Sequence, residues 1–488
     1  SIVITSPACA FSLVKPSSEL IIMSPLIPLI PLTDLEAELA KFNVSGVSIA
    51  LLVASGGDAV IHTQTAGVAD RTSSTPMFDS TWLQIASLSK TIAAAFACEY
   101  FETRGLPMHT TPVNPLLREA GSTFQLKSAP GHPPEWADKV MLAHLLDHTG
   151  LGMHYVNGIP LSHPFPPVLS LMSGSADKAA PYGYASIDLT REPGTRFSYS
   201  GGGFLVLQHL LETREGKPLA ELLSPFFEAS GTAVNLGLSF SQVLPGKHYA
   251  NGYRDDGSMI DEGRLCFPPL AAGGLGTPAA LLDWLRQLAL AYKRPEGCGP
   301  ISHQTAIKML TPGPDLGSVA FMNARMGLGV FIFEVPNAQA GASSKWMLHQ
   351  VNVSSALFSG KGQGSNRYFL CNSPFKHISQ CAHASFPIAS QAANDGFRGV
   401  YLVCFDGPDA SNGPRGFVVL CNGDNQGMFL NCAVCRALLK SPAFSPPISG
   451  LDWSAVPDLS TFSTQGLRQE EIVNLGLKNL VLEAFVGC

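Results

Sequence analysis

Segments with the character of β-strands lie near both ends of this 488-residue chain, and the chain between them is mostly helical or irregular. Near the beginning, 47–53 and 60–65 are rich in β-branched residues and flank a turn at Gly56-Gly57-Asp58, which predicts a hairpin. Near the end, 400–405 and 416–421 form a second apolar pair around a polar turn. This order predicts a sheet built from both ends of the chain, with a helical insertion between them.

The sequence Ser87-Leu88-Ser89-Lys90 stands where an apolar segment passes into a helix that we expect over 91–104. Residues three apart share one face of a helix, so the Lys90 amine is expected beside the Ser87 hydroxyl. A hydroxyl becomes a good nucleophile when a base takes its proton, and a buried lysine with a neutral amine can be that base. Ser-x-x-Lys also occurs by chance, and Ser87 as a helix cap with Lys90 in solvent is the alternative interpretation.

Composition narrows the classes of function. Apolar residues make up 45% of the chain and charged residues 14%, compared with roughly 25% charged residues in an average globular domain. The net charge is only −6 and no long basic run occurs, which gives nucleic-acid binding no support. The apolar segment 20–32 is broken by three prolines, so we expect no transmembrane helix there. We expect residues 1–33 to form an extended arm that packs on a surface.

The 11 cysteines are too sparse for a disulfide scaffold and favour a reducing compartment such as the mitochondrion or the cytoplasm. Cys432-Ala433-Val434-Cys435 is a single pair, for which we expect a role in helix packing. We expect no metal and no cofactor. The segment 335–390 reads as an insertion that covers the site or contacts a partner. Its spacing matches no metal-ligand pattern, although it contains His349, Cys371, His377, Cys381 and His383.

Further motifs follow Ser87-Leu88-Ser89-Lys90 in a fixed order along the chain. They are Leu145-Leu146-Asp147-His148-Thr149-Gly150-Leu151, Pro193-Gly194-Thr195-Arg196-Phe197-Ser198-Tyr199-Ser200, Ala271-Ala272-Gly273-Gly274-Leu275, Asn394-Asp395-Gly396-Phe397-Arg398 and Val418-Val419-Leu420-Cys421-Asn422-Gly423-Asp424. Together they resemble the serine β-lactamase-related family over roughly residues 34–440. This family includes class C β-lactamases, DD-peptidases, β-lactamase-like carboxylesterases and the mitochondrial β-lactamase-like proteins of eukaryotes.

The resemblance implies an α/β (α+β) fold, in which an antiparallel sheet is flanked by helices and carries an inserted helical domain. The sheet-containing domain would comprise residues 34–110 and 265–449, and the mostly helical domain residues 111–264. Residues 450–488 would form a C-terminal extension. Its apolar residues and the N-terminal arm are the expected contacts to protein partners.

The same resemblance implies roles for individual residues. Ser87 would be the nucleophile, Lys90 its activating amine, and Tyr199 the group that shuttles a proton between nucleophile and leaving group. Gly201 stands where the family often has an asparagine that contacts substrate. His148, in its His-Thr-Gly turn, is expected to support the loop.

The family's third motif lies on an edge strand beside the nucleophile. Alignment on Gly396-Phe397 places Ser390, Gln391 and Ala392 there, as substrate-binding residues without the family's lysine or histidine. The N–H groups of Ser87 and Ala393 would then form the oxyanion hole. A second candidate for the motif, ranked lower, is Gly360-Lys361-Gly362.

From these expectations we predict a serine hydrolase that forms an acyl-enzyme on Ser87 from a small ester, amide or peptide substrate. We expect carboxylesterase or peptidase activity rather than lactam hydrolysis, because the polar recognition residues are replaced. An acyltransferase would differ only in the acyl acceptor. The alternative from another class is a weakly active or inactive subunit of a larger assembly, which the altered third motif and the apolar ends favour.

Overall fold

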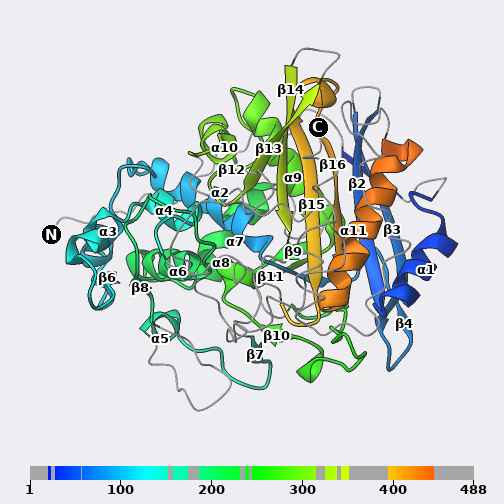
Figure 1. Ribbon diagram of the computed structural model, residues 1–488, viewed down its shortest axis with the longest axis horizontal. Coiled ribbons are helices and arrows are strands. Elements are labelled where there is room, and N and C mark those ends of the chain that lie inside the picture. The colour runs from blue at the N-terminus through cyan, green and yellow to red at the C-terminus, as the bar shows by residue number, and fades with distance from the viewer. Residues whose placement is uncertain are drawn as a thin grey trace, which may run out of the picture.

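The computed structural model describes residues 20–23, 28–55, 58–151, 158–173, 186–230, 237–240, 244–314, 325–337, 342–350 and 394–444. The candidate third motifs at 360–362 and 390–392, the predicted donor Ala393 and the extension 450–488 lie outside these residues. Within the described part, a large sheet stands on one side of the molecule and a group of helices on the other (Figure 1).

The sheet is built from both ends of the chain, as the sequence predicts. β2 pairs with β3 in an antiparallel hairpin, and β16 pairs antiparallel with β2, so that Val47 lies opposite Cys421. The short β4 (Thr75–Pro76) is added to β3, and β1 is the parallel exception. The order is β1 (Leu20–Met23), β3 (Asp58–Asp70), β2 (Gly46–Ser55), β16 (Arg415–Cys421), β15 (Arg398–Asp406), β14 (Ala342–Gln350), β13 (Phe331–Asn337) and β12 (Arg325–Met326).

Alternating side chains of the strands enter two different cores, because neighbouring residues of a strand point to opposite faces. Ala50 and Leu52 belong to one buried cluster, and Ile49 and Leu51 to the other. α9 (Pro278–Lys293) packs against the first face, over β15, β16, β2 and β3. α11 (Asn425–Lys440) and α1 (Leu32–Lys41) cover the second face. The structure is therefore the expected antiparallel sheet flanked by helices (Figure 1).

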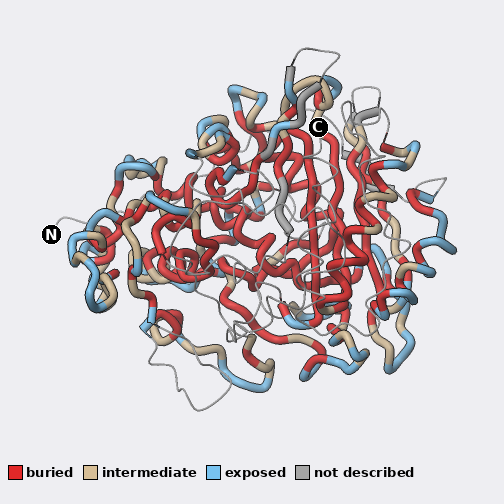
Figure 2. The backbone as a smooth tube through the Cα atoms, in the orientation of Figure 1, coloured by how far each residue is buried: buried red, intermediate tan, exposed pale blue. Residues whose placement is uncertain are grey.

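The remaining helices gather beside the sheet around α2 (Ser89–Glu102), which is buried from Ser89 to Phe101 (Figure 2). They are α3 (Val113–Glu119), α4 (Leu142–Leu146), α5 (Val168–Ser173), α6 (Gly202–Glu215), α7 (Leu219–Ser230), α8 (Pro269–Ala272) and α10 (His303–Leu310). Short helical turns occur at Pro134–Lys139, Asp261–Gly263, Pro408–Ala410 and Pro442–Phe444. The small sheets are β5 (Leu83–Ala86) with β11 (Gly274–Gly276) and β9 (Leu238–Ser239), β10 (Leu265–Cys266) with β7 (Ile159–Pro160), and β6 (Lys127–Ser128) with β8 (Asp188–Leu189).

One segment differs from the sequence-based expectation. The segment 335–390 was expected to be an insertion that covers the site or contacts a partner, yet its first part continues β13 to Asn337 and then forms β14, inside the sheet. β14 pairs with its neighbour β13 and also with the more distant β15, for which a local pattern gives little signal. In the N-terminal segment, β1 is an extended strand that pairs with β3 of the same chain, and contacts of this segment to partners stay a prediction.

The cysteines and helices of the described residues add two findings. Cys432 and Cys435 are buried on α11, and the seven described cysteines are free thiols. None of the described helices combines the length and apolarity needed to cross a bilayer.

Candidate active site

Ser87 lies in a sharp connection between a buried strand and a buried helix. β5 is buried along its whole length and pairs with β11. Ala86, the last residue of β5, has a φ of 47°, in the left-handed region that residues other than glycine rarely adopt. α2 then starts at Ser89. Such backbone strain persists only where the surroundings hold it, and it clusters at functional sites.

Ser89 holds this connection in place. Its hydroxyl donates to the Ala86 carbonyl and accepts the Gly274 N–H at 2.9 Å, so that it ties α2 to β5 and β11. A Cβ on Gly274 would stand 2.6 Å from Ser89 Oγ, which explains why a glycine occupies this position of β11. The second serine of Ser87-Leu88-Ser89-Lys90 is therefore structural, and Ser87 is left as the candidate nucleophile.

Lys90 lies beside Ser87 at the start of α2. Its Nζ lies 3.0 Å from Ser87 Oγ and donates to the Ala271 carbonyl at 2.5 Å. Ser87 and Lys90 are only 2 to 3% exposed. Burial disfavours the charged amine and lowers the pKa of Lys90 to about 7. A substantial fraction of the amine is therefore neutral at pH 7 and able to accept a proton.

Aromatic rings enclose the Lys90 amine on another side. Its Nζ lies 5.0 Å from the ring centroid of Tyr199 and 5.5 Å from that of Phe204. Tyr199 is buried and belongs to the loop just before α6. The structure thus brings Ser87, Lys90 and Tyr199 together, although they come from a strand–helix connection and a distant loop. Their catalytic roles stay predictions.

Gly201 lies at the beginning of α6. It occupies the N-cap position of α6, and the neighbouring Ser200 hydroxyl accepts the Gly202 N–H at 3.1 Å. A glycine supplies no side chain to a substrate at this point. The expected contact through Gly201 is therefore limited to its backbone, and the contact itself stays a prediction.

His148 joins the loop that carries Tyr199 to the end of α4. Its carbonyl accepts the Ser198 N–H at 2.8 Å, and its Nδ1 accepts the Ser200 N–H at 3.1 Å. The imidazole ring lies 4.3 Å from the Tyr199 ring, centroid to centroid. The sequence predicts a supporting role for His148 in its own loop, and the structure shows that it also contacts the loop that carries Tyr199.

The position of the third motif can be compared with the sheet only in part, because 390–393 lies outside the described residues. β15 lies between β16 and β14, and β14 pairs His349 with Tyr401 and Gln350 with Val400. β13 pairs with β14 only as far as Leu348. A Cβ on the nearby Gly399 would lie 3.1 Å from Leu88, so this end of β15 lies next to the start of α2. The end of β14 is thus near the site.

Two residues that the sequence analysis named within motifs, but to which it gave no role, hold the site in place. Ala271, at the end of α8, contributes the carbonyl that accepts from Lys90. Asn394 is buried, and its amide donates to the next carbonyl, Ala272 O, at 2.9 Å and to Gln84 Oε1 at 3.1 Å. A backbone carbonyl leaves no signal in a sequence, whereas the motif Asn394-Asp395-Gly396-Phe397 did contain the asparagine.

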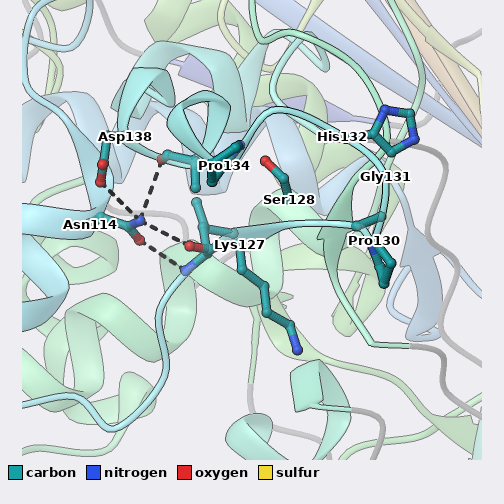
Figure 3. A pocket seen from close by; sticks show the side chains of 11 residues that line it. Asn114, Lys127, Ser128, Pro130, Gly131, His132, Pro134 and Asp138 are labelled. Atoms are coloured by element: carbon teal, nitrogen blue, oxygen red, sulfur yellow. Dashed lines mark hydrogen bonds between the residues drawn. The ribbon is translucent and has the colours of Figure 1, made fainter.

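A separate surface pocket of about 370 Å³ lies among α3, β6 and the helical turn Pro134–Lys139 (Figure 3). Asn114 lines this pocket (Figure 3). Its side-chain amide donates to the Leu126 carbonyl at 3.0 Å and accepts the Leu126 N–H at 2.9 Å. None of the residues of the Ser87 site lines this pocket. Asn114 therefore fixes a loop, and the pocket is separate from the candidate chemistry.

Among the residues that the structure describes, no group of three or more His, Cys, Asp or Glu side chains is arranged to hold a metal ion. The histidines and cysteines named within 335–390 lie outside that part or, for His349, in β14. The chemistry assembled around Ser87 consists of a hydroxyl, an amine, a phenol and backbone groups.

Comparison with known proteins gives a single family. The family model described as Beta-lactamase matches residues 34–425. Among solved structures, the octameric penicillin-binding protein homologue from Pyrococcus abyssi is similar at 19% identity and a TM-score of 0.53, over 85% of this chain and 78% of the other.

Two further structures show the same likeness. The β-lactamase/D-alanine carboxypeptidase from Pseudomonas syringae matches at 18% identity and a TM-score of 0.51, over 84% of this chain and 98% of the other. The D-amino acid amidase from Ochrobactrum anthropi matches at 17% identity and a TM-score of 0.50, over 83% and 96%. At these identities the likeness establishes the fold. Among curated protein sequences, none matches this chain.

Proposed function

Because this chain belongs to the β-lactamase family of serine hydrolases, we propose that it hydrolyses a small ester, amide or peptide through an acyl-enzyme on Ser87. One observation carries the proposal: Ser87 Oγ and Lys90 Nζ lie 3.0 Å apart, and burial lowers the pKa of that lysine to about 7. A nucleophile within hydrogen-bond reach of a neutral base is the arrangement that covalent catalysis requires.

The contacts of Lys90 suit it to act as the base. A neutral amine has two N–H groups and one lone pair. The Ala271 carbonyl accepts one N–H and thereby restricts rotation of the amine, so that the lone pair can face the Ser87 O–H. Ser87 Oγ would attack the substrate carbonyl carbon while its proton passes to Lys90, leaving a tetrahedral oxyanion.

Tyr199 is proposed to complete the transfer. Its O–H would give a proton to the leaving oxygen or nitrogen as the carbonyl bond to that atom breaks, and the Lys90 ammonium would return a proton to the phenolate. Water then attacks the ester on Ser87 by the same groups in reverse and releases the acid. The short distance between Lys90 and the Tyr199 ring supports this sequence.

The oxyanion would be stabilised by two backbone N–H groups, of which one is proposed to be that of Ser87. The second is still predicted to be that of Ala393. An Ala393→Pro variant removes this N–H and also fixes φ at this position. Loss of one oxyanion donor lowers kcat by about 10²–10³-fold, whereas an unchanged kcat would assign the donor elsewhere, with the end of β14 as the next candidate.

The hydrogen-bonded Ser87–Lys90 pair favours the hydrolase over an inactive subunit of an assembly. A buried amine without a carboxylate partner destabilises a fold, and a chain with a purely structural role would gain nothing from keeping it. An acyltransferase would use the same acyl-enzyme and would differ only in the acceptor that replaces water.

The test is labelling of the full-length chain with a fluorophosphonate, followed by mass spectrometry. We expect one adduct on Ser87 and none in the Ser87→Ala and Lys90→Ala variants. Ser224→Ala, which changes an exposed serine on α7, is the matched control and should label like the wild type. Absence of an adduct in folded wild-type protein would contradict the proposal.

A further inference from the structure

His148 contacts the loop that carries Tyr199 on both sides of the tyrosine. Two hydrogen bonds bracket the tyrosine, because the N–H groups of Ser198 and Ser200 are donated to the carbonyl and to Nδ1 of His148. The imidazole ring also packs on the Tyr199 ring, with centroids 4.3 Å apart and planes inclined by 38°. Backbone and ring of the tyrosine are thus both in contact with the same residue.

His148 lies in a tight turn that is itself held by hydrogen bonds. Its φ is 60°, in the left-handed region. The turn around it is closed by Asp147, whose Oδ1 accepts the Thr149 N–H at 3.0 Å and the Thr149 hydroxyl at 2.6 Å. The Thr149 carbonyl in turn accepts the Gly194 N–H at 3.0 Å. The turn is therefore joined to the Tyr199 loop through both His148 and Thr149.

The hydrogen bond to Nδ1 also determines the form of the ring. A nitrogen that accepts an N–H carries no proton, so the neutral ring must have its proton on Nε2. An imidazolium has no acceptor and could not hold the Ser200 N–H. The site thus uses His148 as a hydrogen-bond acceptor at a position where the backbone is left-handed.

We propose that His148 is a positioning residue that sets the orientation of the Tyr199 hydroxyl for proton transfer to the leaving group. This inference rests on the proposed hydrolase and deepens it. His148 takes no proton from the substrate and gives none to it. It acts through the two hydrogen bonds and the ring contact, which fix where the phenol lies relative to Lys90 and Ser87.

The proposal predicts a dependence on the leaving group. An alkoxide leaves poorly and needs the proton that Tyr199 supplies, whereas p-nitrophenolate leaves without one. Misplacement of Tyr199 therefore lowers kcat/KM, which reports formation of the acyl-enzyme, more for an ethyl ester than for the p-nitrophenyl ester of the same acid. A merely structural defect would lower both rates by the same factor, because it would reduce the amount of folded enzyme.

Two substitutions of His148 separate the contribution of the hydrogen-bond acceptor from the contributions of the imidazole ring and of the left-handed backbone. His148→Asn and His148→Gly both tolerate a positive φ and both remove the ring. Only asparagine has an acceptor atom, Oδ1, at the same number of bonds from the backbone as Nδ1. We expect His148→Gly to lower kcat for the ethyl ester by about 10–100-fold with little change in KM, and His148→Asn to recover most of that loss.

The double variant gives an independent measurement. If His148 acts through Tyr199, His148→Gly combined with Tyr199→Phe loses no more activity on the ethyl ester than Tyr199→Phe alone. Multiplied losses would overturn the proposal, as would equal losses on the two esters or equal activity of the glycine and asparagine variants. If His148→Gly does not fold, the ratio of the two ester rates in His148→Asn is the measurement: the retained acceptor should keep this ratio near the wild-type value, and a ratio as low as that of Tyr199→Phe would overturn the proposal.

Fluorophosphonate labelling of the wild type separates this inference from the proposed function. If the wild type does not label and hydrolyses neither ester, the hydrolase itself is wrong. If the wild type labels on Ser87 and the two His148 variants match it on both esters, only the positioning role is wrong.

Discussion

α2 and α9 are two buried helices, and each has, along it or at its start, two polar side chains three residues apart. The two pairs differ in whether a charge is neutralised within the pair. In α9, Asp283 and Arg286 are three residues apart and form an ion pair of 2.7 Å, and Gln287 donates to the second carboxylate oxygen at 3.0 Å. At the start of α2, Ser87 and Lys90 are also three residues apart, but among the described residues no carboxylate forms an ion pair with the lysine.

The two helix starts differ as well. Thr277 caps α9, since its Oγ1 accepts the Ala280 N–H at 3.3 Å. The N-cap of α2 is Leu88, which makes no such bond. α9 thus pairs the Asp283 carboxylate within the helix, caps its own first turn and packs on the sheet. In the proposed function, α2 instead presents a hydroxyl and an amine to a substrate, which would distinguish a helix that carries chemistry from a structural one.

The largest expected effect comes from fixing the charge on Lys90. Lys90→Arg keeps a long cationic side chain but cannot become neutral, so it should lower kcat/KM by about 10³-fold or more. The matched control is Lys293→Arg in the last turn of α9, where the lysine pairs with Asp406. Steady-state kinetics on an activated ester measure both. An active Lys90→Arg enzyme would remove the proposed base.

The second effect should appear in stability alone. Arg286→Met leaves the Asp283 carboxylate buried without its partner, which should lower the free energy of unfolding by about 3–5 kcal/mol. Adding Asp283→Leu should recover most of this loss, because no charge is then buried. Urea denaturation measures the stability, and kcat/KM per folded molecule should stay unchanged. Loss of activity at full stability would mean that α9 also serves the chemistry.

The third effect is a dependence of the rate on pH. The base must be neutral, so activity is lost as the pH falls through the lowered pKa of Lys90, about 7. Between pH 6 and pH 8, kcat/KM should rise about tenfold. Burial also raises the pKa of Asp147, to about 6, so Asp147→Asn is the control. It should keep the rise near pH 7, and a rise that disappears in this variant would belong to the aspartate instead.

The smallest effect tests the cap of α9. Thr277→Ala should lower the stability by about 1 kcal/mol, because the Ala280 N–H loses its acceptor. Thermal unfolding measures the change, and labelling of Ser87 should proceed at the wild-type rate. The comparison between the helices would weaken if the labelling rate fell with the stability.

Local signals in the sequence predicted a good part of this structure. The spacing of Ser87 and Lys90 predicted their proximity. The hairpin of β2 and β3 and the pair of β15 and β16 followed from apolar runs around turns. In each case the residues that interact are close in sequence, where periodicity and capping preferences act.

The parts that escaped prediction depend on distant partners. β14 contains Ser343, Ser344 and Lys345, and only its pairing with β13 and β15 makes it a strand. The Ala271 carbonyl and the left-handed backbone of His148 leave no trace in residue type. The place of the third motif was inferred by alignment on Gly396-Phe397 alone and stays a prediction.

The sheet built from both ends of the chain has a consequence for synthesis. β2 leaves the ribosome long before its partner β16, whose Cys421 lies opposite Val47. At about 5–20 residues per second, the wait is on the order of 20–70 s. During this time an apolar strand has an open edge, which is a hazard for pairing with other chains. We therefore expect the nascent chain to depend on chaperones, and the Ser87 site to be among the last parts to be completed.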